Sequence, residues 1–124
     1  MSTQPSESSV DGLTALVRSF AESRDWQKFH TARNLVLALV GETGELSAEF
    51  QWISDDDIVN ALQDADKREA VGSELADVFI YLLRLADVIG IDLAEELKKK
   101  IAINEKRYPM DKAKGSAAKY TAYE

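Results

Sequence analysis

The 124-residue sequence contains no cysteine, and this absence removes several classes of function. Without thiols the chain can form no disulfide, and it has neither a thiolate metal ligand nor a cysteine nucleophile. Aromatic residues are also scarce, at 8% of the chain, and there are only two prolines. Most packing must therefore come from Leu, Val, Ile and Ala, and any chemistry must use oxygen and nitrogen groups.

Long hydrophobic runs are absent as well. The longest, from Leu35 to Val40, is far shorter than the roughly 20 residues that span a bilayer. The first nine residues are polar and rich in serine, and they lack the basic start and apolar stretch of a signal peptide. These features predict a cytoplasmic protein without a membrane partner.

Positive charge is in deficit, because 15 Lys and Arg residues face 22 Asp and Glu residues, for a net charge of -7. A phosphate backbone would repel such a surface, so we expect no nucleic-acid polymer as partner. The chain is 45% hydrophobic and 30% charged, which is typical of a globular protein, and its length suits one domain.

Apolar residues recur at helical spacing in four stretches, and no segment shows the alternation of a strand. Asp11 and Asp92 are placed to cap the first and the fourth stretch, and Gly90 is placed to end the third. The run Asp55-Asp56-Asp57 is expected to end the second. The pattern predicts helices over residues 11–23, 31–52, 66–88 and 92–108, with a short helical turn at 58–62.

These elements predict an all-α fold, a four-helix bundle. Residues 1–10 are expected to be a disordered N-terminal segment, residues 11–108 the all-α domain, and residues 109–124 an extended C-terminal tail.

Acidic residues interrupt the apolar seams of two predicted helices. Glu42, Glu45 and Glu49 follow the spacing i, i+3, i+7, and Glu74 and Asp77 are three apart on the next long helix. Like charges at such spacing cost an isolated helix roughly 0.2–0.5 kcal/mol per pair, which suggests a shared cation. Oxygen ligands favour a hard ion, and Mg²⁺ is the usual one beside substrate phosphates. The alternative, that these acids are merely solvated, stays open on spacing alone.

The fourth predicted helix carries Lys100, Asn104 and Arg107 at i, i+4, i+7. Such a row could hold phosphate oxygens. Alternatively, its cations simply interact with the negative end of the helix dipole.

Trp26 and Trp52 flank the second predicted helix, and each could stack on a base or close the bundle. The single histidine, His30, is expected to be a structural or surface residue rather than a ligand. A di-iron site is disfavoured, because such bundles use Glu-x-x-His pairs.

Two segments resemble the MazG-like, all-α nucleotide pyrophosphohydrolases: GETGELSAEFQW from Gly41 to Trp52, and ELADVFIY from Glu74 to Tyr81. Within that family, three further segments are similar to the dCTP pyrophosphatase branch. They are FAESRDWQKFH around Trp26, NEKRYP around Tyr108 and GSAAKYT around Tyr120. The resemblance covers roughly residues 11–121.

The resemblance implies a role for each candidate residue. The implied Mg²⁺ ligands are Glu42, Glu45, Glu74 and Asp77, and one of Glu42 or Glu45 would orient or deprotonate the attacking water. The implied nucleoside pocket consists of Trp26, Trp52 and Tyr81. The phosphates would meet Lys100, Asn104 and Arg107. One departure concerns the base, because Val17 stands where animal relatives carry a histidine that faces it.

The implied activity is Mg²⁺-dependent hydrolysis of a nucleoside triphosphate, dCTP, to its monophosphate and pyrophosphate, which would remove surplus or modified nucleotides. The family also implies a bundle completed by oligomerisation, as a homodimer or homotetramer. Two alternatives stay open: the same reaction on another nucleotide such as dUTP or one with a modified base, and a non-catalytic helical dimerisation module.

Overall fold

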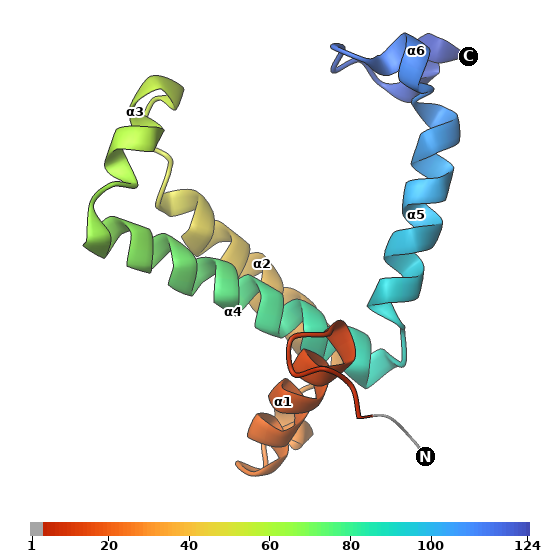
Figure 1. Cartoon of the computed structure of the whole chain (residues 1–124). Coiled ribbons are helices and arrows are strands. Elements are labelled where there is room, and N and C mark those ends of the chain that lie inside the picture. Colours follow the sequence, from red (N-terminus) through yellow and green to blue (C-terminus); the bar gives the residue numbers. More distant parts are fainter. Residues whose placement is uncertain (1–3) are drawn as a thin grey trace. The chain divides into compact units, whose positions relative to one another are not determined.

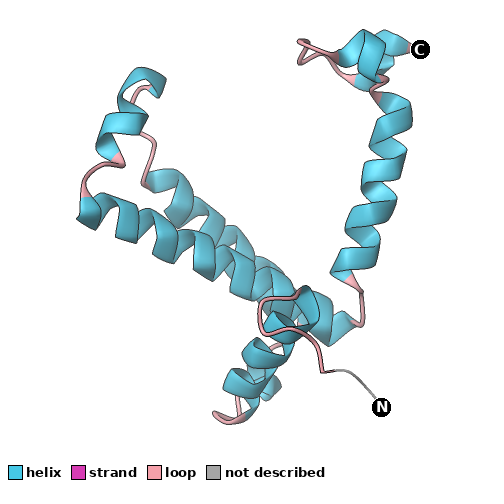
Figure 2. Ribbon diagram, in the orientation of Figure 1, coloured by secondary structure: helices cyan, strands magenta, loops and turns pink. Residues whose placement is uncertain are grey.

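The computed structural model describes residues 4–124, and within them it contains helices and no strand (Figure 2). The predicted all-α fold class is confirmed. Residues 1–3, part of the segment expected to be disordered, lie outside the described residues. The α-helices are α1 (Val10–Glu22), α2 (Ala32–Ala48), α3 (Asp55–Ala61), α4 (Ala65–Ile89), α5 (Leu93–Arg107) and α6 (Met110–Ala113). Two 3-10 turns, η1 (Gln27–Phe29) and η2 (Tyr120–Tyr123), complete the description.

Side-chain caps define where the long helices begin. Thr31, Asp64 and Asp92 each accept a hydrogen bond from the backbone N–H three residues later, at the starts of α2, α4 and α5. The predicted capping residue of α1 was wrong by two positions: Ser9 is the cap, and Asp11 lies in the first turn. Gly90 ends α4 in the left-handed region, with φ 74°, as predicted.

Two predicted boundaries need correction. The second helix ends at Ala48 rather than at Trp52, and residues 49–52 form turns. The three aspartates that were expected to end it instead form the first turn of α3. This placement is favourable, because carboxylates interact well with the positive end of a helix dipole. The segment 109–124 is also less extended than expected, since it contains α6 and η2.

The chain divides into two compact units, Met1–Gly90 and Ile91–Glu124. In the first unit α2 and α4 lie side by side, and α1 packs against α4 (Figure 1). The buried apolar side chains come from these three helices: Ala21, Leu35, Val71, Leu83 and Ala86. Many other large apolar side chains are exposed, so this unit buries little of its apolar surface by itself.

The second unit is built around α5. Its C-terminal segment folds back onto the end of that helix, where Tyr108 meets Tyr120 and Tyr123 edge to face, with ring centroids 6.3 and 6.1 Å apart. Among residues 4–124, no helix combines the length and apolar character that crossing a membrane requires.

Candidate functional site

Three glutamates meet between α2 and α4. Glu42 and Glu45, one turn apart on α2, and Glu74 of α4 each place one carboxylate oxygen so that the three atoms lie within 4.8 Å of one another. The spacing i, i+3 puts the first two on the same face of α2. Because α2 and α4 pack along their length, that face meets Glu74. We call this group the acidic cluster.

The acidic cluster is not neutralised by the described part of the chain. Oε2 of Glu42 and Oε2 of Glu74 are buried, and neither has a hydrogen-bond partner there. Loss of hydration, followed by a hydrogen bond with Glu45 and the charges of neighbouring carboxylates, raises the pKa of Glu42 to about 7. Loss of hydration, with the charge of Glu45, also raises the pKa of Glu74. Buried carboxylate oxygens without donors are the ligands that a hard divalent cation takes, so these residues fit a metal.

Asp77 lies beside the acidic cluster rather than in its centre. Its charge contributes to the raised pKa of both Glu42 and Glu74, yet its carboxylate is not among the three within 4.8 Å. Its assignment as a metal ligand stays a prediction.

Glu49, the third acid of the α2 strip, has a partner inside the chain. Its Oε2 accepts a hydrogen bond from Nζ of Lys67 at 2.7 Å. The shared spacing therefore does not make Glu49 equivalent to Glu42 and Glu45.

A cavity of about 260 Å³ opens beside α4. Two of the three residues predicted for the nucleoside pocket, Trp26 and Tyr81, line it, and so does Asp77. Trp52 does not, because it lies in the turn after α2 with 89% of its surface exposed. The full lining is Val17, Phe20, Ala21, Trp26, His30, Asp77, Ile80, Tyr81 and Arg84.

Trp26 is held at the cavity by the turn that ends α1. Its N–H donates to the carbonyl of Ala21 at 3.0 Å, and the N–H of Asp25 donates to the carbonyl of Glu22 at 3.0 Å. This is the bonding pattern of a Schellman motif, with Asp25 in the left-handed region at φ 56°. The Trp26 ring packs edge to face on Phe20, with centroids 5.6 Å apart.

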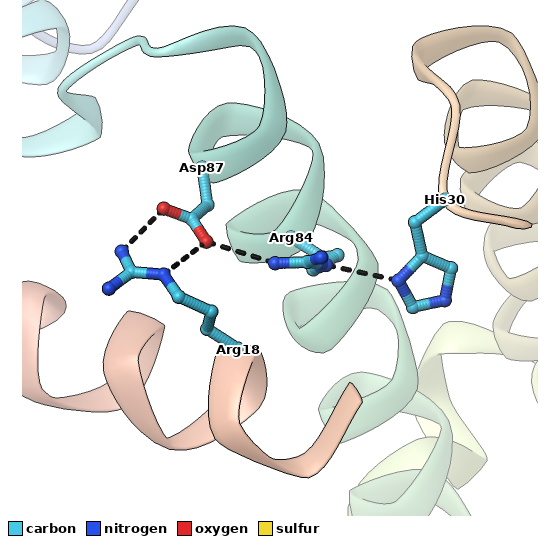
Figure 3. Close-up of polar contacts among 4 residues, drawn as sticks. All are labelled: Arg18, His30, Arg84 and Asp87. Atoms are coloured by element: carbon cyan, nitrogen blue, oxygen red, sulfur yellow. Dashed lines mark hydrogen bonds and ion pairs between the residues drawn. The ribbon is translucent and has the colours of Figure 1, made fainter. Parts of the chain in front are cut away.

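A second polar group, the arginine network, joins α1, α4 and the segment before α2 (Figure 3). Arg18 donates to both carboxylate oxygens of Asp87, at 2.6 and 2.8 Å. Arg84 donates from Nη1 to Asp87 at 3.0 Å and from Nε to Nδ1 of His30 at 3.0 Å. These hydrogen bonds, first that from Arg18, hold the pKa of Asp87 below its ordinary value.

The sequence reasoning missed this network. It treated His30 as structural and did not consider Arg84. One available signal was the spacing of Asp77, Tyr81 and Arg84, at i, i+4 and i+7 on one face of α4.

The residues predicted to meet phosphates, Lys100, Asn104 and Arg107, lie on α5 in the second unit and share one face of that helix. The guanidinium of Arg107 lies over the ring of Tyr120, 4.5 Å from its centroid. The C-terminal segment thus contacts one of the three predicted residues.

Comparison with known proteins gives a consistent result. Residues 39–122 match the model of the MazG-like family. The chain is 44% identical over 115 residues to dCTP pyrophosphatase 1 of Mus musculus, covering 93% of this chain and 68% of that protein. The identity to the Homo sapiens protein of the same name is 43%, with the same coverage. A crystal structure of a pyrophosphatase from Archaeoglobus fulgidus superimposes with a TM-score of 0.77 at 36% identity, covering 88% of this chain and 98% of that one.

Proposed function

This chain belongs to the MazG-like family, and from that membership we infer that it is a nucleoside triphosphate pyrophosphohydrolase that converts dCTP and water into dCMP and pyrophosphate. The observation that carries this proposal is the acidic cluster, whose buried carboxylate oxygens lack partners, next to a cavity lined by Trp26 and Tyr81. Asp77 belongs to the surroundings of both. Helix α4 thus contributes residues both to the acidic cluster, where a phosphate would react, and to the cavity, where a base would bind.

We propose that Glu42, Glu45, Glu74 and Asp77 hold Mg²⁺. When bound, the ion supplies positive charge for the triphosphate oxygens and for the pyrophosphate that leaves. A site with oxygen ligands alone suits Mg²⁺ better than it suits softer metal ions.

A general base must be an acceptor within reach of the water that attacks. Glu42 and Glu45 are the two carboxylates that α2 contributes to the acidic cluster, beside the proposed cation. We propose that a carboxylate oxygen of Glu42 or Glu45 takes the proton of the attacking water.

The substrate is bound at two places. Trp26 stacks on the base, Tyr81 contacts the deoxyribose, and a 2′-hydroxyl finds no partner at this apolar contact, which favours deoxynucleotides. Lys100, Asn104 and Arg107 bind the phosphate oxygens through charge-assisted hydrogen bonds. Trp52 is 89% exposed and does not line the cavity of its own chain. We propose that it belongs to the nucleoside pocket only when a second copy of the chain completes that pocket.

The exposed apolar side chains of the first unit support a homodimer or homotetramer. On α2 these are Val36, Leu37 and Val40, and on α4 they are Leu75 and Phe79, each between 42% and 65% exposed. Burying such surface stabilises by roughly 25 cal/mol per Å², so association is favoured. Sedimentation at micromolar concentration tests this, and a monomeric mass would contradict it.

The activity is tested with a panel of ribo- and deoxynucleoside triphosphates, by measuring pyrophosphate release with Mg²⁺ and with a chelator. We expect dCTP to have the highest specificity constant and hydrolysis to stop without the metal. Preference for dUTP or a modified base would keep the enzyme class and reject dCTP. No release from any nucleotide would favour a non-catalytic dimerisation module.

A further inference from the structure

Two polar side chains of the cavity lining have no part in the proposed metal binding or base stacking. They are His30 and Arg84. Arg84 is only 6% exposed, and a guanidinium tolerates such burial only when its N–H groups are bonded. Its Nη1 donates to Asp87 and its Nε donates to His30 (Figure 3). Asp87 also accepts two hydrogen bonds from Arg18, so the guanidinium of Arg84 is held between this carboxylate and the His30 ring.

The bond from Arg84 sets the protonation of His30. Because Nδ1 of His30 accepts the Nε–H of Arg84, Nδ1 must keep its lone pair, and the neutral ring carries its hydrogen on Nε2. Burial, and then the charge of Arg84, lower the pKa of His30, which favours the same neutral form. His30 therefore offers a hydrogen-bond donor at Nε2.

Arg84 keeps a donor as well. Within residues 4–124, no group accepts a hydrogen bond from Nη2 of Arg84 or from Nε2 of His30. Both side chains line the cavity, so its lining includes two donors that have no acceptor in the described part of the chain. The only carboxylate in the arginine network, that of Asp87, is already engaged by Arg18 and Arg84.

We propose that His30 and Arg84 select the base, donating from Nε2 and Nη2 to the adjacent acceptors O2 and N3 of cytosine. This inference rests on the proposed function. Uracil and thymine carry a hydrogen on N3, so one of the two protein donors would face another donor. Leaving a buried donor unpaired lowers affinity by about 10- to 100-fold, which is the discrimination expected against those bases.

The position of these residues along α4 agrees with that assignment. Asp77, beside the acidic cluster, and Arg84 are seven residues apart on one face of the helix, a separation of about 10 Å at 1.5 Å per residue. A nucleotide lying along α4 thus has its reacting phosphate near one end and its base near the other. Val17, which also lines the cavity, is apolar and offers the base no hydrogen bond.

The first test changes the substrate and leaves the protein intact. Specificity constants are measured with Mg²⁺ for dCTP, dUTP and 3-deaza-dCTP, in which a C–H replaces N3. We expect both analogues to be about 10- to 100-fold poorer than dCTP. Hydrolysis of dCTP with equal constants for the analogues would overturn the base-reading role and keep the enzyme. No hydrolysis of any of the three would reject the proposed function itself.

The second test changes the protein. Arg84→Lys keeps a cation near Asp87 but loses Nη2, and His30→Phe keeps a ring without a donor. In each folded variant, the preference for dCTP over dUTP should fall by about 10-fold or more, and the affinity for dCMP, measured by calorimetry with a chelator present, should fall alike. Lys28→Met, an exposed change in η1, is the matched control and should keep both values. An unchanged preference in His30→Phe would overturn the proposal.

Discussion

The acidic cluster and the arginine network share helix α4, yet they differ in how their charges are satisfied. In the arginine network every described contact of the Asp87 carboxylate is with a guanidinium, and the pKa of Asp87 is lowered. In the acidic cluster two buried carboxylate oxygens have no partner, and the pKa of Glu42 is raised to about 7. The described chain completes the first group itself, whereas for the second we propose a cation from outside.

The largest effect is expected at the acidic cluster. Replacing Glu42 or Asp77 with Ala should lower hydrolysis of dCTP by more than about 100-fold, since even groups that only support metal ligands typically contribute about 10- to 100-fold. The helical circular dichroism should persist, because removing like charges does not disturb packing. Glu49→Gln is the matched control: this acid is paired with Lys67, so its activity should stay within a few-fold of the parent. Equal losses in all three variants would remove the distinction between Glu49, which is paired with Lys67, and the proposed metal ligands.

The arginine network should respond in stability. Asp87→Asn leaves the buried guanidinium of Arg84 without its counter-charge, and breaking a buried pair in this way costs about 3 kcal/mol or more. Arg18→Ala should cost about 1 kcal/mol or less, because the Arg18 side chain is 46% exposed. Urea denaturation measures both. A larger loss for Arg18→Ala than for Asp87→Asn would show that the network is not organised around Arg84.

A variant of Trp26 tests substrate binding separately from the reaction. The proposed stacking of Trp26 on the base acts on ground and transition states alike, so Trp26→Ala should raise KM by about 5- to 100-fold and change kcat little. Glu42→Ala and Asp77→Ala should instead lower kcat and change KM little. Steady-state kinetics with dCTP decides, and a loss confined to kcat would place the base elsewhere.

The two groups should also respond to pH in different ranges. In metal-free protein the raised pKa of Glu42 means that the folded state binds this proton more tightly than the unfolded state. The free energy of unfolding should therefore fall as pH rises from about 4.5 to about 7. The lowered pKa of Asp87 acts in the other direction, and its contribution is lost as pH falls below 3.8.

Thermal unfolding at pH 5 and pH 7.5 with a chelator measures the effect of Glu42. Glu42→Gln should reduce the difference in Tm between the two pH values. Mg²⁺ should raise Tm at pH 7.5. Equal Tm values with and without Mg²⁺ at that pH would argue against a cation in the acidic cluster.

The sequence predicted the elements that depend on local pattern. Apolar periodicity located α1, α2, α4 and α5, because an amphipathic helix is specified by its own residues. The spacing of Glu42 and Glu45 likewise placed two carboxylates on one face.

Contacts between distant segments were beyond that reasoning. The bond between Arg84 and His30 joins residues 54 positions apart, and it depends on how the segment before α2 packs against α4. The exposure of Trp52 follows from the early end of α2, which periodicity alone did not reveal.

Binding of a divalent cation by the acidic cluster is measured most simply by direct titration. Mn²⁺, a paramagnetic substitute for Mg²⁺, is titrated into the parent protein, Glu74→Gln and Glu49→Gln while free Mn²⁺ is followed by electron paramagnetic resonance. We expect binding by the parent and by Glu49→Gln, and at least about 10-fold weaker binding by Glu74→Gln. Equal affinity of Glu74→Gln and the parent would contradict cation binding by the acidic cluster.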